Sequence, residues 1–397
     1  MEPLFHYSPY IGWVYPNETV FEWSILIAIY PYLTGLVAGA FTVSSLYQVF
    51  GFQRLKPVAH LALLTSLCMM LFVPLPLLLH LGHPERAFNN LLTPHLTSAM
   101  AVFGYFASFY ILLLVLESWF AFRPYIVEQA QKTSGVLRSF YRVLTLGSYD
   151  VSEKALAYDR KWIFWLAVTG IPGAHGLHGY VGFVFGSLKS REWWSSDLMP
   201  VVFLFSAIIS GVSLLVVLYV LSCKLRKTPI DVDCVKGMAY TVWAFIMVTL
   251  ALEGLMFANI VYKGREGVDM IIQHVTGALL VPYWVLQFGI GAITPLLLLT
   301  YMIWRGTKGK ALVVGVTVSA CLVLLSVFVM RWNVVIGGQE LSKTGKGLLY
   351  YHLTLFGQEG LLNAILVMAI PFVVLLGAVR LFPPWDDHAN ASDRVSP

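Results

Sequence analysis

Nine long stretches without Asp, Glu, Lys or Arg constrain this chain more than any other feature. Eight of them exceed the roughly 20 residues that a helix needs to cross a bilayer, at 1.5 Å per residue. The sixth reaches that length only if Glu253 is buried. Barrel strands would be about 10 residues long with alternating polarity, which these stretches do not show. The sequence therefore predicts an all-α integral membrane protein with about nine transmembrane helices, within a range of 8–10. The stretches cover residues 23–53, 57–84, 87–116, 162–188, 198–223, 237–252 (to 262 past Glu253), 270–304, 311–330 and 360–379.

Composition supports this class. Of 397 residues, 58% are hydrophobic and 12% are charged, about half the charged fraction of soluble domains. This excludes a soluble or disordered protein, so the net charge of +5 indicates no nucleic-acid partner. The four cysteines form no CxxC pair, so we expect no iron–sulfur cluster, no metal site and no covalent haem in this chain.

The basic residues predict the orientation. With nine spans, one side of the membrane receives 18 of the 26 Lys and Arg residues, and the positive-inside rule makes that side cytoplasmic. The N-terminus is then outside and the C-terminus inside. The long inner loop, 121–160, is amphipathic and predicts a helix on the inner surface. The segment around 270–275 is expected at the outer interface, ahead of its span.

Titratable side chains gather toward the predicted outer face. Glu253 interrupts an apolar stretch about two turns from its outer end, where a structural partner and a proton relay are equally reasonable interpretations. His175 and His178, three residues apart, share one helix face. Glu117 is the main buried acid near the inner side. This pattern is typical of a site that exchanges protons with the outer compartment.

Three stretches resemble the NrfD/PsrC family of membrane anchors of polysulfide-reductase-like complexes. They are EWSILIAIYPYLTGLVAGAF (22–41), LGHPERAFNNLLTPHLTSAM (81–100) and RWNVVIGGQELSKTGKG (331–347) with the following GQEG (357–360). The VIGGQ loop is similar to that of the Qrc-type menaquinone reductases and the alternative complex III subunits. Family members often have Asp where His80 stands and Arg where His83 stands, so no carboxylate role carries over to His80.

The resemblance implies an architecture and a set of partners. It implies a first four-helix bundle with a quinone site (1–190, including the inner loop), a second bundle (191–335), and an outer loop, last helix and cytoplasmic tail (336–397). It implies menaquinone or another quinone as bound substrate, in the cytoplasmic membrane of a prokaryote. It also implies a periplasmic ferredoxin-like iron–sulfur subunit outside, with a molybdopterin-type or multihaem cytochrome subunit beyond it and lipids around the helices.

Quinone chemistry suggests roles for the candidate residues, because reduction of a quinone needs hydrogen-bond donors that also supply protons. We expect three sets of residues. The quinone-binding set is Glu22, Tyr30, Tyr32, His80, His175 and His178; the proton-transfer set is Glu117, Glu253 and Arg331; the partner-docking set is His83 and Arg86.

Three alternatives compete with this interpretation. Haem b is disfavoured: His80 with His175 or His178 could hold one haem at one depth, but two stacked haems need paired histidines on each of two helices, and the inner half offers only His60. A secondary transporter or channel would explain the Gly and Pro residues within the helices, but not the outward bias of the charged groups. The third alternative is a purely structural anchor for an extracytoplasmic enzyme.

Overall fold

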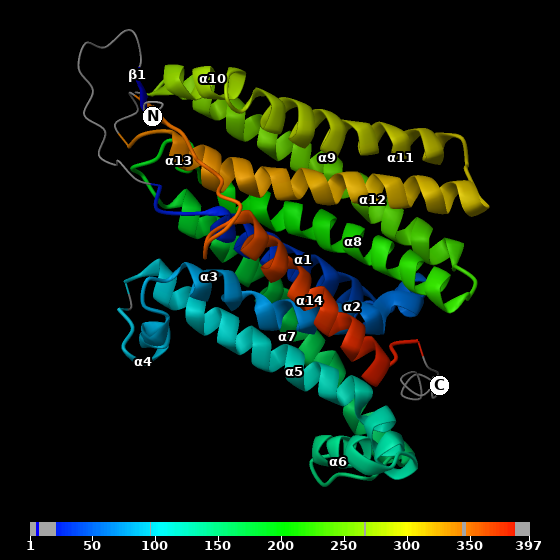
Figure 1. Cartoon of the computed structure of the whole chain (residues 1–397). Coiled ribbons are helices and arrows are strands. Elements are labelled where there is room, and N and C mark those ends of the chain that lie inside the picture. The colour runs from blue at the N-terminus through cyan, green and yellow to red at the C-terminus, as the bar shows by residue number, and fades with distance from the viewer. Residues whose placement is uncertain (1–4, 8–20, 96, 266, 344–346, 386–397) are drawn as a thin grey trace.

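The computed structural model describes residues 5–7, 21–95, 97–265, 267–343 and 347–385. Residues 386–397 of the predicted tail lie outside the described residues. The chain forms an elongated body of roughly aligned helices (Figure 1). One end carries β1, α3, α4, α10 and α13, and we call it the β1 end. The opposite end carries α6, and we call it the α6 end.

The elements follow one another as long helices joined by short connections. They are β1 (Phe5–Tyr7), α1 (Ile25–Gln48), η1 (Gln53–Leu55), α2 (Lys56–Phe72), α3 (Pro74–His80), η2 (Pro84–Arg86), α4 (Asn89–Leu92), α5 (Ala99–Lys132), α6 (Gly135–Leu144), α7 (Glu153–Gly186), α8 (Met199–Arg226), α9 (Val232–Lys263), α10 (Val268–Thr276), η3 (Leu280–Ile293), α11 (Thr294–Trp304), α12 (Gly309–Trp332), η4 (Asn333–Gly337), α13 (Gly338–Glu340), β2 (Gly347–Leu349) and α14 (Leu361–Leu381).

The helical membrane fold predicted from the charge-free stretches is confirmed. Among the described residues, eight helical segments are long and apolar enough to span a membrane. The fourth predicted span corresponds to α7, which has 34 residues but is not among those eight. The count of nine and the outside position of the N-terminus therefore stay predictions.

Local sequence signals explain where the helices begin and bend. The Ser24 side chain accepts a hydrogen bond from Leu26 N at the start of α1. Asp231 caps α9 in the same way, and its Oδ1 accepts from the backbone N–H groups of Asp233 and Cys234. Such caps satisfy amide groups that have no partner inside the helix. Pro74 stands at the junction of α2 and α3. Proline removes a helix hydrogen bond and bends the helix axis, so the break between α2 and α3 falls at this residue.

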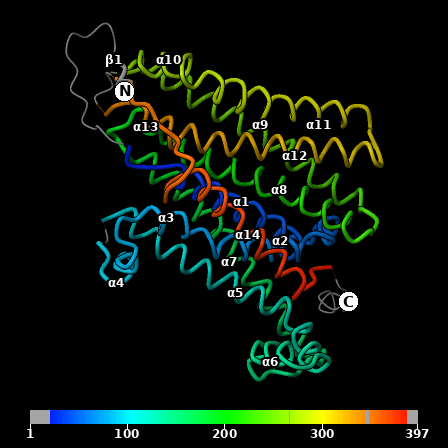
Figure 2. The backbone as a smooth tube through the Cα atoms, viewed as in Figure 1, coloured from blue at the N-terminus to red at the C-terminus, as the bar shows by residue number. Residues whose placement is uncertain are grey.

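Helix α1 lies at the centre of the body, between α8 and α2 (Figure 2). Its most apolar window is 94% buried, whereas that of α14 is 22% buried. The close packing of α1 on α8 depends on Gly39 and Gly211, because a Cβ atom added at Gly211 would lie 2.4 Å from Gly39 Cα. Small residues let helix backbones approach in this way inside membranes. The outer helices present large apolar side chains to lipid.

Two predicted boundaries differ from the structure. The sequence predicts a helix from residue 87 in the third stretch, but α5 begins at Ala99, and η2, α4 and turns precede it. The inner loop 121–160 does contain an amphipathic helix, α6, yet α5 continues to Lys132 and α7 already begins at Glu153. Both helices therefore project past their charge-free stretches at the α6 end. The segment expected at the interface forms the separate short helix α10, and its depth in the membrane stays a prediction.

The β1 end also contains a two-stranded antiparallel sheet. Strand β1 pairs with β2, with His6 opposite Leu348. This pairing joins the start of the chain to the segment between α13 and α14. The proposed division into two bundles at residue 190 stays a prediction. Helices α1 and α12, which the division assigns to different bundles, pack against each other.

Candidate functional site

Arg331, at the end of α12, is the centre of a buried polar cluster. Its side chain has no exposed surface. Nη2 lies 3.0 Å from His178 Nε2 on α7 and 2.6 Å from Ser206 Oγ on α8. A guanidinium only donates hydrogen bonds, so His178 Nε2 must accept and the neutral ring carries its proton on Nδ1. The cluster thus joins a permanent cation to a neutral imidazole.

Packing fixes the geometry of this cluster. The Arg331 guanidinium carbon lies 3.8 Å above the centre of the Phe203 ring, a cation–π contact of about 2 kcal/mol where water is excluded. The His178 ring stacks on the same Phe203, with centroids 5.8 Å apart. Gly35 on α1 leaves room for the imidazole, since a Cβ there would approach His178 Cε1 to 3.2 Å. Four helices therefore determine where the Arg331 and His178 side chains point.

A second set of hydrogen-bonded polar side chains lies beside the Arg331 cluster, on α9, η3 and η4. Gln287 Nε2 donates to Glu253 Oε2 at 2.7 Å, and Asn333 Nδ2 donates to Gln287 Oε1 at 2.8 Å. Gln287 belongs to the π-helical segment η3 and Asn333 opens the π-helical η4. Such wide turns are frequent at functional sites.

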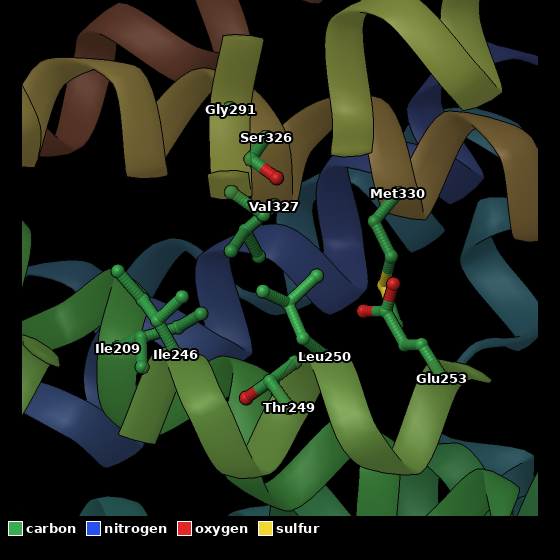
Figure 3. A pocket seen from close by; sticks show the side chains of 10 residues that line it. Ile209, Ile246, Thr249, Leu250, Glu253, Gly291, Ser326, Val327 and Met330 are labelled. Atoms are coloured by element: carbon green, nitrogen blue, oxygen red, sulfur yellow. The ribbon is translucent and has the colours of Figure 1, made fainter. Parts of the chain in front are cut away.

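A small cavity adjoins Glu253. Its volume of about 20 Å³ is enough for one water molecule. In Figure 3 the Glu253 carboxylate extends toward Met330, with Thr249 and Ser326 further along the cavity wall. The hydroxyls of Thr249 and Ser326 donate to backbone carbonyls, so their lone pairs can still accept a hydrogen bond from water.

The connection between α7 and α8 holds the backbone that follows Arg331. Trp193 Nε1 donates to Asn333 O at 3.2 Å, and Trp194 Nε1 donates to Val334 O at 2.5 Å. Arg191 Nη1 donates to Leu341 O at 2.9 Å. These bonds tie the connection to the backbone of η4 and to the residue after α13.

Of the predicted quinone-binding residues, the structure brings His178, His175 and Tyr32 nearest to the cluster. His175 is half-buried; its Nδ1 lies 2.8 Å from Ile171 O, and its Nε2 faces Thr42 Oγ1 at 3.4 Å. Tyr32 donates to Leu324 O on α12 at 3.2 Å. Tyr30 points to another face of α1, where its ring packs edge-on against Phe103.

Four predicted residues lie apart from this cluster, at the β1 end. Glu22 is exposed ahead of α1. His80 Nδ1 lies 2.6 Å from Glu359 Oε1, which ties α3 to the segment before α14. His83 and Arg86 are exposed, and His83 Nδ1 lies 2.9 Å from Glu85 Oε1.

Glu117 lies deep within α5, toward the α6 end. It is fully buried, and neither of its carboxylate oxygens has a hydrogen-bond partner among the described residues. The buried hydroxyls of Tyr110 and Thr65 likewise have none. Buried polar groups in proteins are normally satisfied by protein or by ordered water, so this acid is exceptional in the body.

Sequence reasoning missed Ser206, Phe203, Gln287 and Asn333. A search for ionisable residues passes over neutral amides and hydroxyls. Gln287 nevertheless carried a signal, because it is a lone amide inside the apolar segment LVPYWVLQFGIGAI. Asn333 stands two residues after Arg331 and could have been included with it.

Comparison with known proteins places the chain in a family. The model of the family described as polysulphide reductase, NrfD, matches residues 14–342. The C subunit of selenate reductase from Mesobacillus selenatarsenatis is 33% identical over 322 residues, which are 79% of this chain and 73% of that protein. A putative dimethyl sulfoxide reductase membrane subunit of Halobacterium salinarum is 28% identical, over 71% of this chain and 62% of its own length. The Hdr-like menaquinol oxidoreductase integral membrane subunit of Archaeoglobus fulgidus is 25% identical, over 68% of this chain and 60% of its own length. Because the family model covers most of the sequence, the chain belongs to the polysulphide reductase NrfD family.

Proposed function

We propose that this chain is the membrane subunit of a respiratory oxidoreductase complex. It exchanges electrons between a membrane quinone, menaquinone or a related one, and an iron–sulfur subunit on the periplasmic side. Relatives named as subunits of selenate and dimethyl sulfoxide reductases, and as part of a menaquinol oxidoreductase, support this role. The observation that carries the proposal is the buried Arg331–His178 pair.

The donor chemistry of this cluster suits a quinone headgroup. Nε of Arg331 is buried and has no hydrogen-bond partner among the described residues, so one guanidinium N–H is available to a carbonyl oxygen. His175 is half-buried beside it on α7, and a Cβ at the adjacent Gly176 would meet nothing within 4 Å. A flat ring arriving from the lipid would therefore reach His175 before the buried pair.

Each side chain has a separate role in this proposal. A bound quinone supplies two-electron, two-proton redox chemistry. Arg331 stabilises negative charge that develops on a carbonyl oxygen, since a buried cation acts strongly at low dielectric. His175 and His178 hold protons at the headgroup, with Tyr32 as a supporting donor. Tyr30, Glu22 and His80 flank the route to it from the β1 end.

Protons move through two further groups. Glu253, with Gln287 and the water-sized cavity, connects the cluster to the outer face. Glu117 holds a proton on the other side of the cluster, nearer the α6 end. His83 and Arg86 are exposed at the β1 end, where they contact the iron–sulfur subunit. A molybdopterin-type or multihaem subunit lies beyond it, and the N-terminus faces outside.

Replacement of His178 tests the proposal. We expect His178→Ala to lower quinone-linked turnover of the assembled complex about 100-fold or more, the usual contribution of a general acid or base. Complex assembly, followed by co-purification, should be unchanged. The matched control is His352→Ala, which removes an exposed imidazole that has no role in the proposal. Unchanged turnover in His178→Ala would remove this residue from the site.

A further inference from the structure

A groove at the α6 end lies outside the quinone cluster. It has a volume of about 640 Å³ and is formed by α5, the start of α7 and the turn between α6 and α7. Its lining residues are Trp119, Phe120, Arg123, Ser148, Asp150, Lys154, Ala155, Ala157, Tyr158, Asp159 and Lys161. The groove combines an aromatic wall with charged side chains, and the proposed quinone chemistry uses none of them.

Aromatic side chains mark the depth of this groove in the membrane. Phe120 stacks on Trp162 with nearly parallel rings, 6.0 Å between centroids. Tyr158 is 58% exposed and Trp165 is 55% exposed on the same stretch of α7. Exposed Trp and Tyr residues concentrate at the headgroup level of a bilayer. The groove therefore opens where lipid headgroups lie.

Three of the lining residues form a stripe on α7. Lys154, Tyr158 and Lys161 follow the i, i+4, i+7 spacing that places side chains on one helix face. The two lysines lie about 10 Å apart along the axis, so both ammonium groups can reach one phosphate. Neither lysine has an ion-pair partner in the described part of the chain.

The remaining charges in the groove are already neutralised or held by the protein. Arg123 pairs with Asp159 at 2.6 Å, and both side chains are 3% exposed. Asp150 accepts a hydrogen bond from Ser152 N at 2.9 Å, which holds the pKa of that carboxyl below its usual range. One carboxylate thus faces two free lysines, and the groove keeps a net positive charge.

The neighbouring helix α6 extends this surface. Val136, Val143 and Leu146 are 87%, 72% and 74% exposed, and Arg138 and Arg142 are exposed among them. An amphipathic helix with apolar side chains on one side and arginines on the other lies in the headgroup layer, and its basic residues favour anionic lipids.

We propose that the groove between α5, α7 and the α6–α7 turn binds one anionic phospholipid. Its phosphate contacts Lys154 and Lys161, and an acyl chain follows the aromatic wall of Phe120 and Trp162. The proposal is independent of the quinone site. The apolar wall favours a phospholipid over free phosphate as the ligand, because a free anion would make no contact with that wall.

Native mass spectrometry of the purified chain in mild detergent tests this binding. Phosphatidylglycerol and phosphatidylcholine of equal chain length are titrated into the protein. We expect preferential retention of phosphatidylglycerol, and about 30-fold weaker retention by the Lys154→Ala/Lys161→Ala variant, from about 1 kcal/mol for each lysine near an anionic headgroup. The charge-conserving Lys154→Arg/Lys161→Arg variant should retain the lipid, and its thermal unfolding should match that of the parent.

The matched control is Lys308→Ala/Lys310→Ala, which removes one lysine from the α11–α12 connection and one from the first turn of α12. Equal losses in the two alanine variants would overturn the proposal, because the lysines would then act only through net charge. No preference for phosphatidylglycerol in the parent protein would overturn it as well. Displacement of the lipid by millimolar inorganic phosphate would show a simple anion site instead.

Discussion

The ion pair between Arg123 and Asp159 should be the strongest single tie between α5 and α7 at the α6 end. Arg123 donates from Nε to Asp159 Oδ2 at 2.8 Å, and Nη2 lies 2.6 Å from the same oxygen. Nη1 donates to Asp150 O at 2.7 Å. Both paired side chains are almost completely buried, so solvent screening is weak. Each partner therefore depends on the other for compensation of its charge.

The loss of stability in each variant depends on which buried charge is left without its partner. In Arg123→Met, Asp159 becomes an unpaired buried carboxylate, which costs about 3–5 kcal/mol. Asp159→Leu leaves an unpaired buried guanidinium with a similar cost. The Arg123→Met/Asp159→Leu variant removes both charges, and replacement of a whole buried pair by apolar groups is often near neutral. Its remaining cost is the lost bond to Asp150 O, about 1 kcal/mol.

Unfolding of the four proteins in mixed micelles, titrated with a denaturing detergent, measures this cycle. We expect the double variant to be more stable than either single variant, with a coupling energy of at least about 2 kcal/mol. Arg142→Ala, which removes an exposed arginine from α6, serves as the control and should change stability by less than about 0.5 kcal/mol. Additive effects of the two single substitutions would refute the pairing.

Two further predictions concern packing and proton transfer. Gly211→Ala should greatly reduce the yield of folded protein in size-exclusion chromatography, because its Cβ would lie 2.4 Å from Gly39 Cα and force α1 and α8 apart. The control Gly254→Ala has nothing within 4 Å of its Cβ and should keep the parental yield. Glu253→Gln keeps a hydrogen-bonding oxygen for Gln287 but cannot carry an exchangeable acid proton. Quinone-linked turnover should therefore fall about tenfold or more, while the midpoint of thermal unfolding stays within a few degrees. Full turnover would exclude Glu253 from the proton path.

The helices were predictable because long charge-free stretches have no other stable structure in lipid. Their ends were less predictable. Residues 87–98 belong to a charge-free stretch, yet the described ones among them form α4 and turns at the β1 end. In contrast, α5 continues to Lys132 through charged residues, since polar helix turns are tolerated once the helix leaves the hydrocarbon layer. Charge marks the membrane boundary and not the end of a helix.

The candidate site was predictable as residues but not as contacts. His178 and Arg331 both stand out as ionisable groups in apolar surroundings, yet the sequence assigns them to different parts of the chain. Their 3.0 Å contact joins positions 153 residues apart. It depends on how α7, α8 and α12 cross, which hydropathy does not encode. Ser206 was invisible for a different reason, because one hydroxyl in an apolar helix is common and often only bonds to its own backbone.

The connection between α7 and α8 explains how helices so far apart in sequence can hold one site. It follows the helix that carries His178 and precedes the helix that carries Ser206, and its own Trp193 and Trp194 bind the carbonyls directly after Arg331. These bonds therefore tie the turn after Arg331 to the loop that joins the helices of the other two groups. Side chains locked in this way need little reorganisation when charge develops beside them, which is the condition for effective electrostatic stabilisation. In the proposed function, the two tryptophans therefore position Arg331 through the backbone that follows it.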